Sequence, residues 1–92
     1  MLYIVAYDIG SEKERRKVSR ALDGYGEWAQ QSVYLCELDQ PLLAKLRRDL
    51  ERLALTTGFV LAWGARGETP ALEVGAESVG RAAWKPSRVF VF

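Results

Sequence analysis

The chain has 92 residues, a net charge of +1, 49% hydrophobic residues and 27% charged residues. These values are typical of one small folded domain and exclude an intrinsically disordered chain. No apolar run approaches the roughly 20 residues of a membrane span, and the first residues lack the basic start of a signal peptide. We therefore expect a single cytoplasmic domain over residues 1–92, with no membrane partner. Because the net charge is small, the distribution of charge must decide whether nucleic acid is a partner.

The first half of the chain predicts a strand followed by a helix. The run LYIVAYDI at residues 2–9 is β-branched and aromatic throughout, which is typical of a strand buried on both faces. Ser11 and Glu14 have the spacing of a capping box, so we expect a helix that begins there and runs to about Asp23. GYG at 24–26 ends this helix. Its predicted core stripe is Val18, Ala21, Leu22 and Tyr25.

An extended segment and a second helix follow. Residues 29–38, AQQSVYLCEL, predict one extended stretch, and residues 27–38 contain no turn signal. Asp39 then caps a leucine-rich helix with Pro41 near its first turn, and we expect this helix to run to about residue 55. TTG breaks it, and FVLAW after the break predicts a strand.

The last third of the chain has a weaker pattern. Residues 64–87 are rich in glycine and proline, and only ALEV at 71–74 resembles a short strand. RVFVF at 88–92 alternates like a strand, and its backbone groups need a partner edge. We therefore divide the single domain into a core at 2–63 and a glycine-rich connection with a C-terminal strand at 64–92.

The order β-α-β-α-β-β predicts an α+β sandwich of ferredoxin-like type, with two helices on one face of an antiparallel sheet. That fold requires a hairpin between its two helices. The stretch 27–38 shows none, so a bent or bulged strand there would reconcile the sequence with the fold.

The residue types limit the chemistry available to the chain. Histidine is absent and Cys36 is the only cysteine. Serine and cysteine triads of the usual kind, an internal disulfide and a zinc cluster are therefore excluded. Cys36 itself fits a small buried hydrophobic residue. Any chemistry must use carboxylates, hydroxyls, lysine, arginine, tyrosine and bound ions.

Basic residues are concentrated on the first predicted helix. At about 100° per residue, four of them fall on one stripe that faces away from the core, with Glu12 and Asp23 off the stripe. This pattern fits either a solvated helix face or a surface that follows nucleic-acid phosphates, and the sequence leaves both open. The stripe consists of Lys13, Arg16, Lys17 and Arg20.

Asp8 is a candidate for metal or phosphate chemistry because it comes at the end of an apolar run. The alternative is a cap or turn residue. One carboxylate rarely holds Mg²⁺ without phosphate oxygens and waters, so two copies across a dimer axis would make a better site. Arg15 points toward this strand end, where it either pairs with an acid or steadies a phosphate.

Ser32 and Tyr34 are candidates for the lining of a cleft. They alternate with Val33, so we expect them to share one face of the sheet. Tyr34 would either stack on a base or cover the sheet.

Together, these stretches resemble the CRISPR-associated protein 2 family, the small subunit of the spacer-acquisition machinery. The resemblance covers residues 3 to about 63. YDI ends the first strand, RRKV lies on the first helix, and GYGEWAQQSVY fits the family's glycine-aromatic-glycine, glutamine and serine-valine-aromatic pattern. The resemblance implies a ferredoxin-like homodimer in which the C-terminal strand completes the partner's sheet.

The resemblance also implies a function. Family members act as metal-dependent nucleases on RNA or DNA, with Mg²⁺ or Mn²⁺ between two copies of Asp8, which would then be both catalytic residue and metal ligand. They also hold double-stranded DNA as a bridge between copies of the integrase, CRISPR-associated protein 1; single-stranded RNA is the alternative substrate. The competing hypothesis is a non-catalytic ferredoxin-like interaction or RNA-binding domain. The nucleic-acid contacts would be Lys13, Arg15, Arg16, Lys17 and Arg20.

Two positions depart from the family pattern. Where many members have arginine after the GYGE-type turn, this chain has Trp28 and then Ala29. Where they usually have glutamate after the serine-valine-aromatic triplet, it has Leu35. Loss of a cation and an acid near the cleft weakens the nuclease hypothesis more than the scaffold hypothesis.

Overall fold

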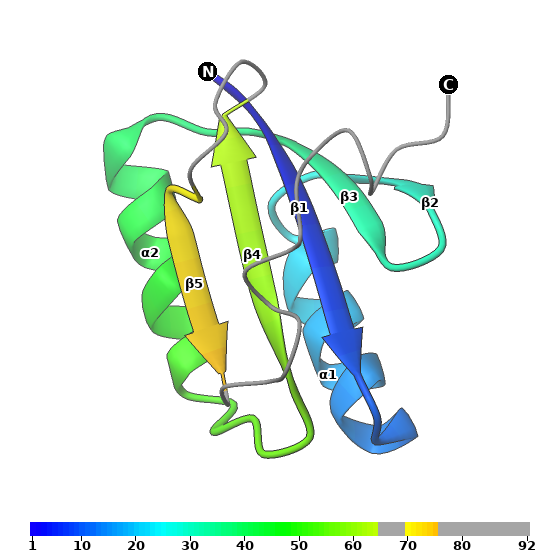
Figure 1. The fold of residues 1–92 in the computed structure, drawn as a ribbon. Coiled ribbons are helices and arrows are strands. Elements are labelled where there is room, and N and C mark those ends of the chain that lie inside the picture. The colour runs from blue at the N-terminus through cyan, green and yellow to red at the C-terminus, as the bar shows by residue number, and fades with distance from the viewer. Residues whose placement is uncertain (65–69, 76–92) are drawn as a thin grey trace.

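The computed structural model describes residues 1–64 and 70–75. Five strands form one antiparallel sheet in the order β2-β3-β1-β4-β5, and both helices cover one face of it (Figure 1). The first four strands have the ferredoxin-like order, and β5 extends the sheet beyond β4. The predicted fold class is therefore confirmed. Along the chain the elements are β1 (Leu2–Ile9), α1 (Glu12–Asp23), β2 (Glu27–Gln30), β3 (Val33–Glu37), α2 (Gln40–Glu51), β4 (Gly58–Gly64) and β5 (Leu72–Gly75).

Strand β1 supplies side chains to both faces of the sheet, because successive residues of a strand point in opposite directions. Tyr3, Val5, Tyr7 and Ile9 join the larger core cluster with leucines of both helices. Ala6 belongs to a second cluster with residues of β3 and β4. Asp8 shares the parity of Ala6, so its carboxylate lies on the face opposite the helices.

The two predicted helix starts are confirmed. The Ser11 hydroxyl accepts a hydrogen bond from the Glu14 amide at 3.2 Å, and the Asp39 carboxylate accepts one from the Leu42 amide at 2.9 Å. The return bond of the capping box is not formed, however. The Glu14 carboxylate instead accepts bonds from the amides and hydroxyls of Thr56 and Thr57 at 2.6–3.2 Å. This side chain therefore ties α1 to the loop before β4.

Helix α2 ends at Glu51, earlier than the predicted residue 55. Ala54 has a left-handed φ of 51°, which breaks the helix and turns the chain toward β4. Gly58 then begins β4 against β1, where an added Cβ would lie only 1.9 Å from the Asp8 carbonyl oxygen. The strands predicted at FVLAW and ALEV are present as β4 and β5.

The segment between the helices is a hairpin and not the single extended stretch that the sequence predicts. Strands β2 and β3 pair antiparallel around Gln31 and Ser32, and the register shifts between Trp28 and Gln30 as in a bulge. Ser32 has a left-handed φ of 63°. Because this turn uses a serine where hairpins usually have glycine or asparagine, the sequence carried no signal for it.

The predicted C-terminal strand at 88–92 and most of the glycine-rich connection lie outside the described residues. Neither helix in the described part of the chain is long and apolar enough to cross a membrane.

Candidate nucleic-acid interface

The basic stripe lies on the outer side of α1. All four of its residues are exposed, whereas Val18 and Leu22 on the opposite side of the helix are fully buried. Arg16 forms an ion pair with Glu12 at 2.8 Å, and both side chains are exposed. The other three stripe residues form no ion pair with any described residue. The stripe therefore presents cations that the described fold does not use for its own stability.

Besides Glu14, two further acids of α1 lie off the stripe, Glu12 and Asp23, and both have partners within the described chain. Glu12 pairs with Arg16, so it neutralises part of the stripe. Asp23 accepts a hydrogen bond from the Tyr34 hydroxyl at 2.7 Å and so joins the end of α1 to β3. This hydrogen bond explains why an acid lies at the end of α1.

Arg15 lies at the end of β1, as predicted. Its Nη1 atom donates to the carbonyl oxygens of Ile9 and Gly10 at 3.0 and 3.3 Å. It forms no ion pair with a described acid, so the first of its two predicted roles is not observed there. These two bonds fix the guanidinium in place while the side chain stays exposed, and its other N–H groups remain able to donate to an anion.

Asp8 lies inside β1, paired in register with Phe59, one residue before the strand ends. Its side chain is exposed and forms no hydrogen bond or ion pair with a described residue, so it does not act as a cap within the described fold. The described residues contain no group of three or more acids and cysteines that could hold a metal ion. One chain therefore offers a single free carboxylate at this position.

The predicted cleft position of Tyr34 is wrong. Tyr34 is only 2% exposed, and its hydroxyl contacts the Ser19 hydroxyl and the Asp23 carboxylate, each at 2.7 Å. Burial raises the pKa of Tyr34, with the Asp23 bond adding to the effect. Helix α1 packs over this part of β3, so the ring cannot stack on a base. Ser32 lies in the hairpin turn and does not share a strand face with Tyr34.

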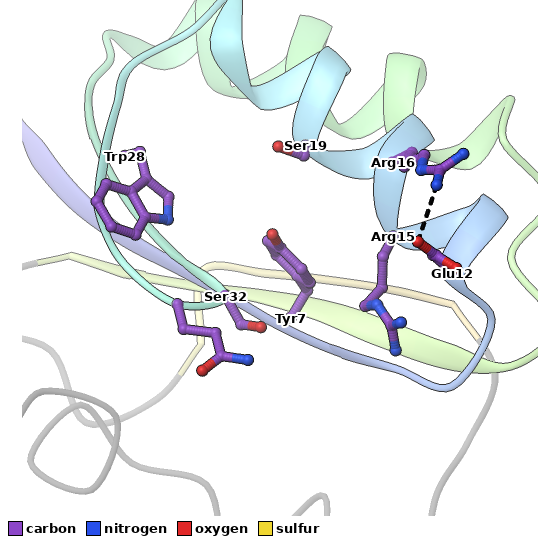
Figure 2. Close-up of a pocket in the computed structure, with 8 residues that line it drawn as sticks. Tyr7, Glu12, Arg15, Arg16, Ser19, Trp28 and Ser32 are labelled. Atoms are coloured by element: carbon purple, nitrogen blue, oxygen red, sulfur yellow. Dashed lines mark hydrogen bonds and ion pairs between the residues drawn. The ribbon is translucent and has the colours of Figure 1, made fainter.

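A surface hollow of about 550 Å³ lies between α1 and the β2–β3 turn. Figure 2 shows Trp28 on one side of it and Arg15 and Arg16 on the other, with Tyr7 and Ser19 between them. The sequence predicted functional roles for Arg15, Arg16 and Ser32 but no binding role for Trp28. The signal that could have identified Trp28 is that a tryptophan stands where many family members have arginine. We refer to this feature as the α1–hairpin hollow; its lining is Tyr7, Glu12, Arg15, Arg16, Ser19, Trp28, Gln31 and Ser32.

The sheet order, the two helices on one face and the outward basic stripe define a small ferredoxin-like α+β protein with a cationic helix. Residues 1–64 match the sequence model of the family described as CRISPR associated protein Cas2. The chain therefore belongs to the CRISPR-associated protein Cas2 family.

Individual relatives agree with this assignment. The chain is 40% identical over 53 residues to the CRISPR-associated endoribonuclease Cas2 1 of Chloroflexus aurantiacus, a match that spans 58% of this chain and 57% of the relative. It is 41% identical over 75 residues to the CRISPR-associated endonuclease Cas2 2 of Thermus thermophilus, spanning 80% and 83% of the two chains. Among solved structures, the hypothetical protein TT1823 from Thermus thermophilus superposes with a TM-score of 0.66 at 38% identity, over 83% of this chain and 94% of that one.

Proposed function

We propose that this chain acts in CRISPR spacer acquisition as a nucleic-acid-binding homodimer, together with the CRISPR-associated integrase. Family membership supports the pathway. The observation that carries the binding role is the basic stripe, in which Lys13, Lys17 and Arg20 are exposed and unpaired within the described chain. Exposed cations along one face of a rigid helix suit the phosphates of double-stranded DNA, and such contacts hold a duplex without reading its sequence.

The homodimer is proposed from the sequence of the chain. A domain of this size has a modest core, and the alternating RVFVF segment at 88–92 requires a partner edge. We propose that this segment completes the sheet of a second copy. A duplex bound across the two copies would then meet two basic stripes.

The binding role is tested with the double variant Arg16→Ala/Arg20→Ala. It should bind blunt duplexes of unrelated sequence more weakly than the wild-type chain, and by the same factor for each duplex, because phosphates carry no sequence information. The matched control removes two exposed cations from α2 in Lys45→Ala/Arg48→Ala. Equal affinities for the wild-type chain and the stripe variant would refute the proposal.

A second candidate function is metal-dependent cleavage of nucleic acid. The relatives above are named endoribonuclease and endonuclease, and the exposed Asp8 carboxylate is not used by the described fold. Two copies of Asp8 across a dimer axis would give Mg²⁺ or Mn²⁺ two carboxylates, with water and phosphate oxygens as its remaining ligands. A metal held there would supply a hydroxide nucleophile and offset charge on the phosphate. Arg15, fixed at the same strand end, would hold the scissile phosphate.

Asp8→Asn tests this second candidate. It should abolish Mn²⁺ binding measured by calorimetry, together with any metal-dependent cleavage, while leaving the dimer and duplex binding unchanged. Cleavage at the wild-type rate by the purified variant would show that Asp8 is not catalytic.

A further inference from the structure

Trp28 is an exposed aromatic residue at the edge of the described sheet. The side chain is 64% exposed, and among the described strands its strand β2 pairs with β3 alone. It belongs to neither of the core clusters of the described residues. Tryptophan is usually well buried, so the exposed indole beside a hollow leaves an aromatic face available to a ligand.

The opposite side of the α1–hairpin hollow has the chemistry of an anion site. Arg15 is fixed by two carbonyl oxygens, and Arg16 lies beside it with its guanidinium exposed and paired with Glu12. Two guanidinium groups and one carboxylate leave a net positive charge on this side. The planar fork of arginine matches the oxygens of a phosphate or a carboxylate, so these groups can hold the phosphate of a nucleotide.

The hollow therefore combines a flat aromatic surface with a phosphate-binding edge. Figure 2 shows the two on opposite sides, with the hydroxyl-bearing Tyr7, Ser19 and Ser32 between them. Its volume of about 550 Å³ falls in the range of small-molecule sites, which is large enough for a nucleotide. Stacking on an indole requires a base whose face is free, which interior bases of a duplex do not offer.

We propose that the α1–hairpin hollow binds one unpaired nucleotide of a single-stranded nucleic acid, with its base stacked on Trp28 and its phosphate held by Arg15 and Arg16. The inference deepens the proposed function and rests on it. Arg16 belongs to both the basic stripe and the hollow, so a strand that leaves a duplex on the stripe enters the hollow directly. Neither stacking nor phosphate binding requires a 2′-hydroxyl, so single-stranded DNA and RNA both satisfy the site.

Fluorescence anisotropy with labelled dT12, rU12 and a blunt two-stranded DNA duplex tests this inference. Trp28→Ala should weaken binding of both single strands by about tenfold, within the range that one base stacked on an aromatic ring contributes, and should leave binding of the blunt duplex unchanged. Trp28→Phe should retain most of the affinity, whereas Trp28→Leu should lose it, because leucine keeps apolar bulk without an aromatic face. Leu42→Ala, which removes an exposed apolar side chain from α2, is the matched control.

The inference and the proposed function fail in different ways. Unchanged single-strand affinity in both Trp28→Ala and Trp28→Leu would overturn the inference, as would an equal loss for the single strands and the blunt duplex. Loss of dT12 binding without loss of rU12 binding would also overturn it, because the site would then select the sugar. Failure of Arg16→Ala/Arg20→Ala to weaken binding of the blunt duplex would instead refute the proposed function.

Discussion

Tyr34→Phe distinguishes a structural tyrosine from one that contacts nucleic acid. The substitution keeps the buried ring and removes the hydroxyl, which contacts Ser19 and Asp23 at 2.7 Å each. A net contribution of about 1 kcal/mol for each bond gives a loss of about 2 kcal/mol in the free energy of unfolding. For a domain of this size, that loss lowers the melting temperature by roughly 10 °C.

Differential scanning calorimetry measures this effect, and duplex and dT12 affinities are measured on the same samples below the transition. Tyr3→Phe is the matched control, because the Tyr3 hydroxyl forms no hydrogen bond with a described residue. We expect a large loss of stability for Tyr34→Phe with unchanged affinity. Unchanged stability together with weaker binding would refute the placement of Tyr34 as a link between β3 and α1.

Three further outcomes follow from the structure. Hydrogen bonds from the Thr57 hydroxyl and the Thr56 amide lower the pKa of Glu14 from 4.5 to about 2; its contribution to stability is therefore complete above pH 4.5 and is lost as the pH falls toward 2. Between these pH values, the free energy of unfolding measured in urea should depend less on pH for Glu14→Gln than for the wild-type chain. The same pH dependence in both proteins would contradict the stabilising role of the Glu14 carboxylate. Gly58→Ala should lower the free energy of unfolding, measured by chemical denaturation, by roughly 3 kcal/mol, because its Cβ would lie 1.9 Å from the Asp8 carbonyl oxygen. A loss of stability near zero would show that β1 and β4 can move apart easily at this position. Glu12→Gln frees Arg16 and should tighten dT12 binding, whereas weaker binding would mean that Glu12 orients Arg16 for the ligand.

Local signals predicted the helices and most strands. Ser11 and Asp39 mark the helix starts because a cap depends on residues adjacent in sequence. The end of α2 was missed because Ala54 takes a left-handed conformation that tertiary structure imposes. The hairpin was missed for the same reason, since Ser32 occupies the position where glycine or asparagine would have signalled a turn.

The site was predicted in part because helical spacing determines which side chains share a surface. The exposed basic stripe and the position of Arg15 follow from the 3.6-residue repeat. The interactions of Glu14 with Thr56 and Thr57 join residues more than 40 positions apart, which no local pattern reveals. The hollow beside Trp28 likewise depends on how α1 packs against the hairpin.

The salt dependence of duplex binding tests the central claim most directly. Each phosphate neutralised by the protein contributes about 0.9 to the slope of log affinity against log salt concentration. We expect Arg16→Ala/Arg20→Ala to flatten the wild-type slope by one to two such increments, equally for unrelated duplexes, and Lys45→Ala/Arg48→Ala to leave it unchanged. A stripe variant with the wild-type slope would contradict the account, because the basic stripe would then be only a solvated helix face.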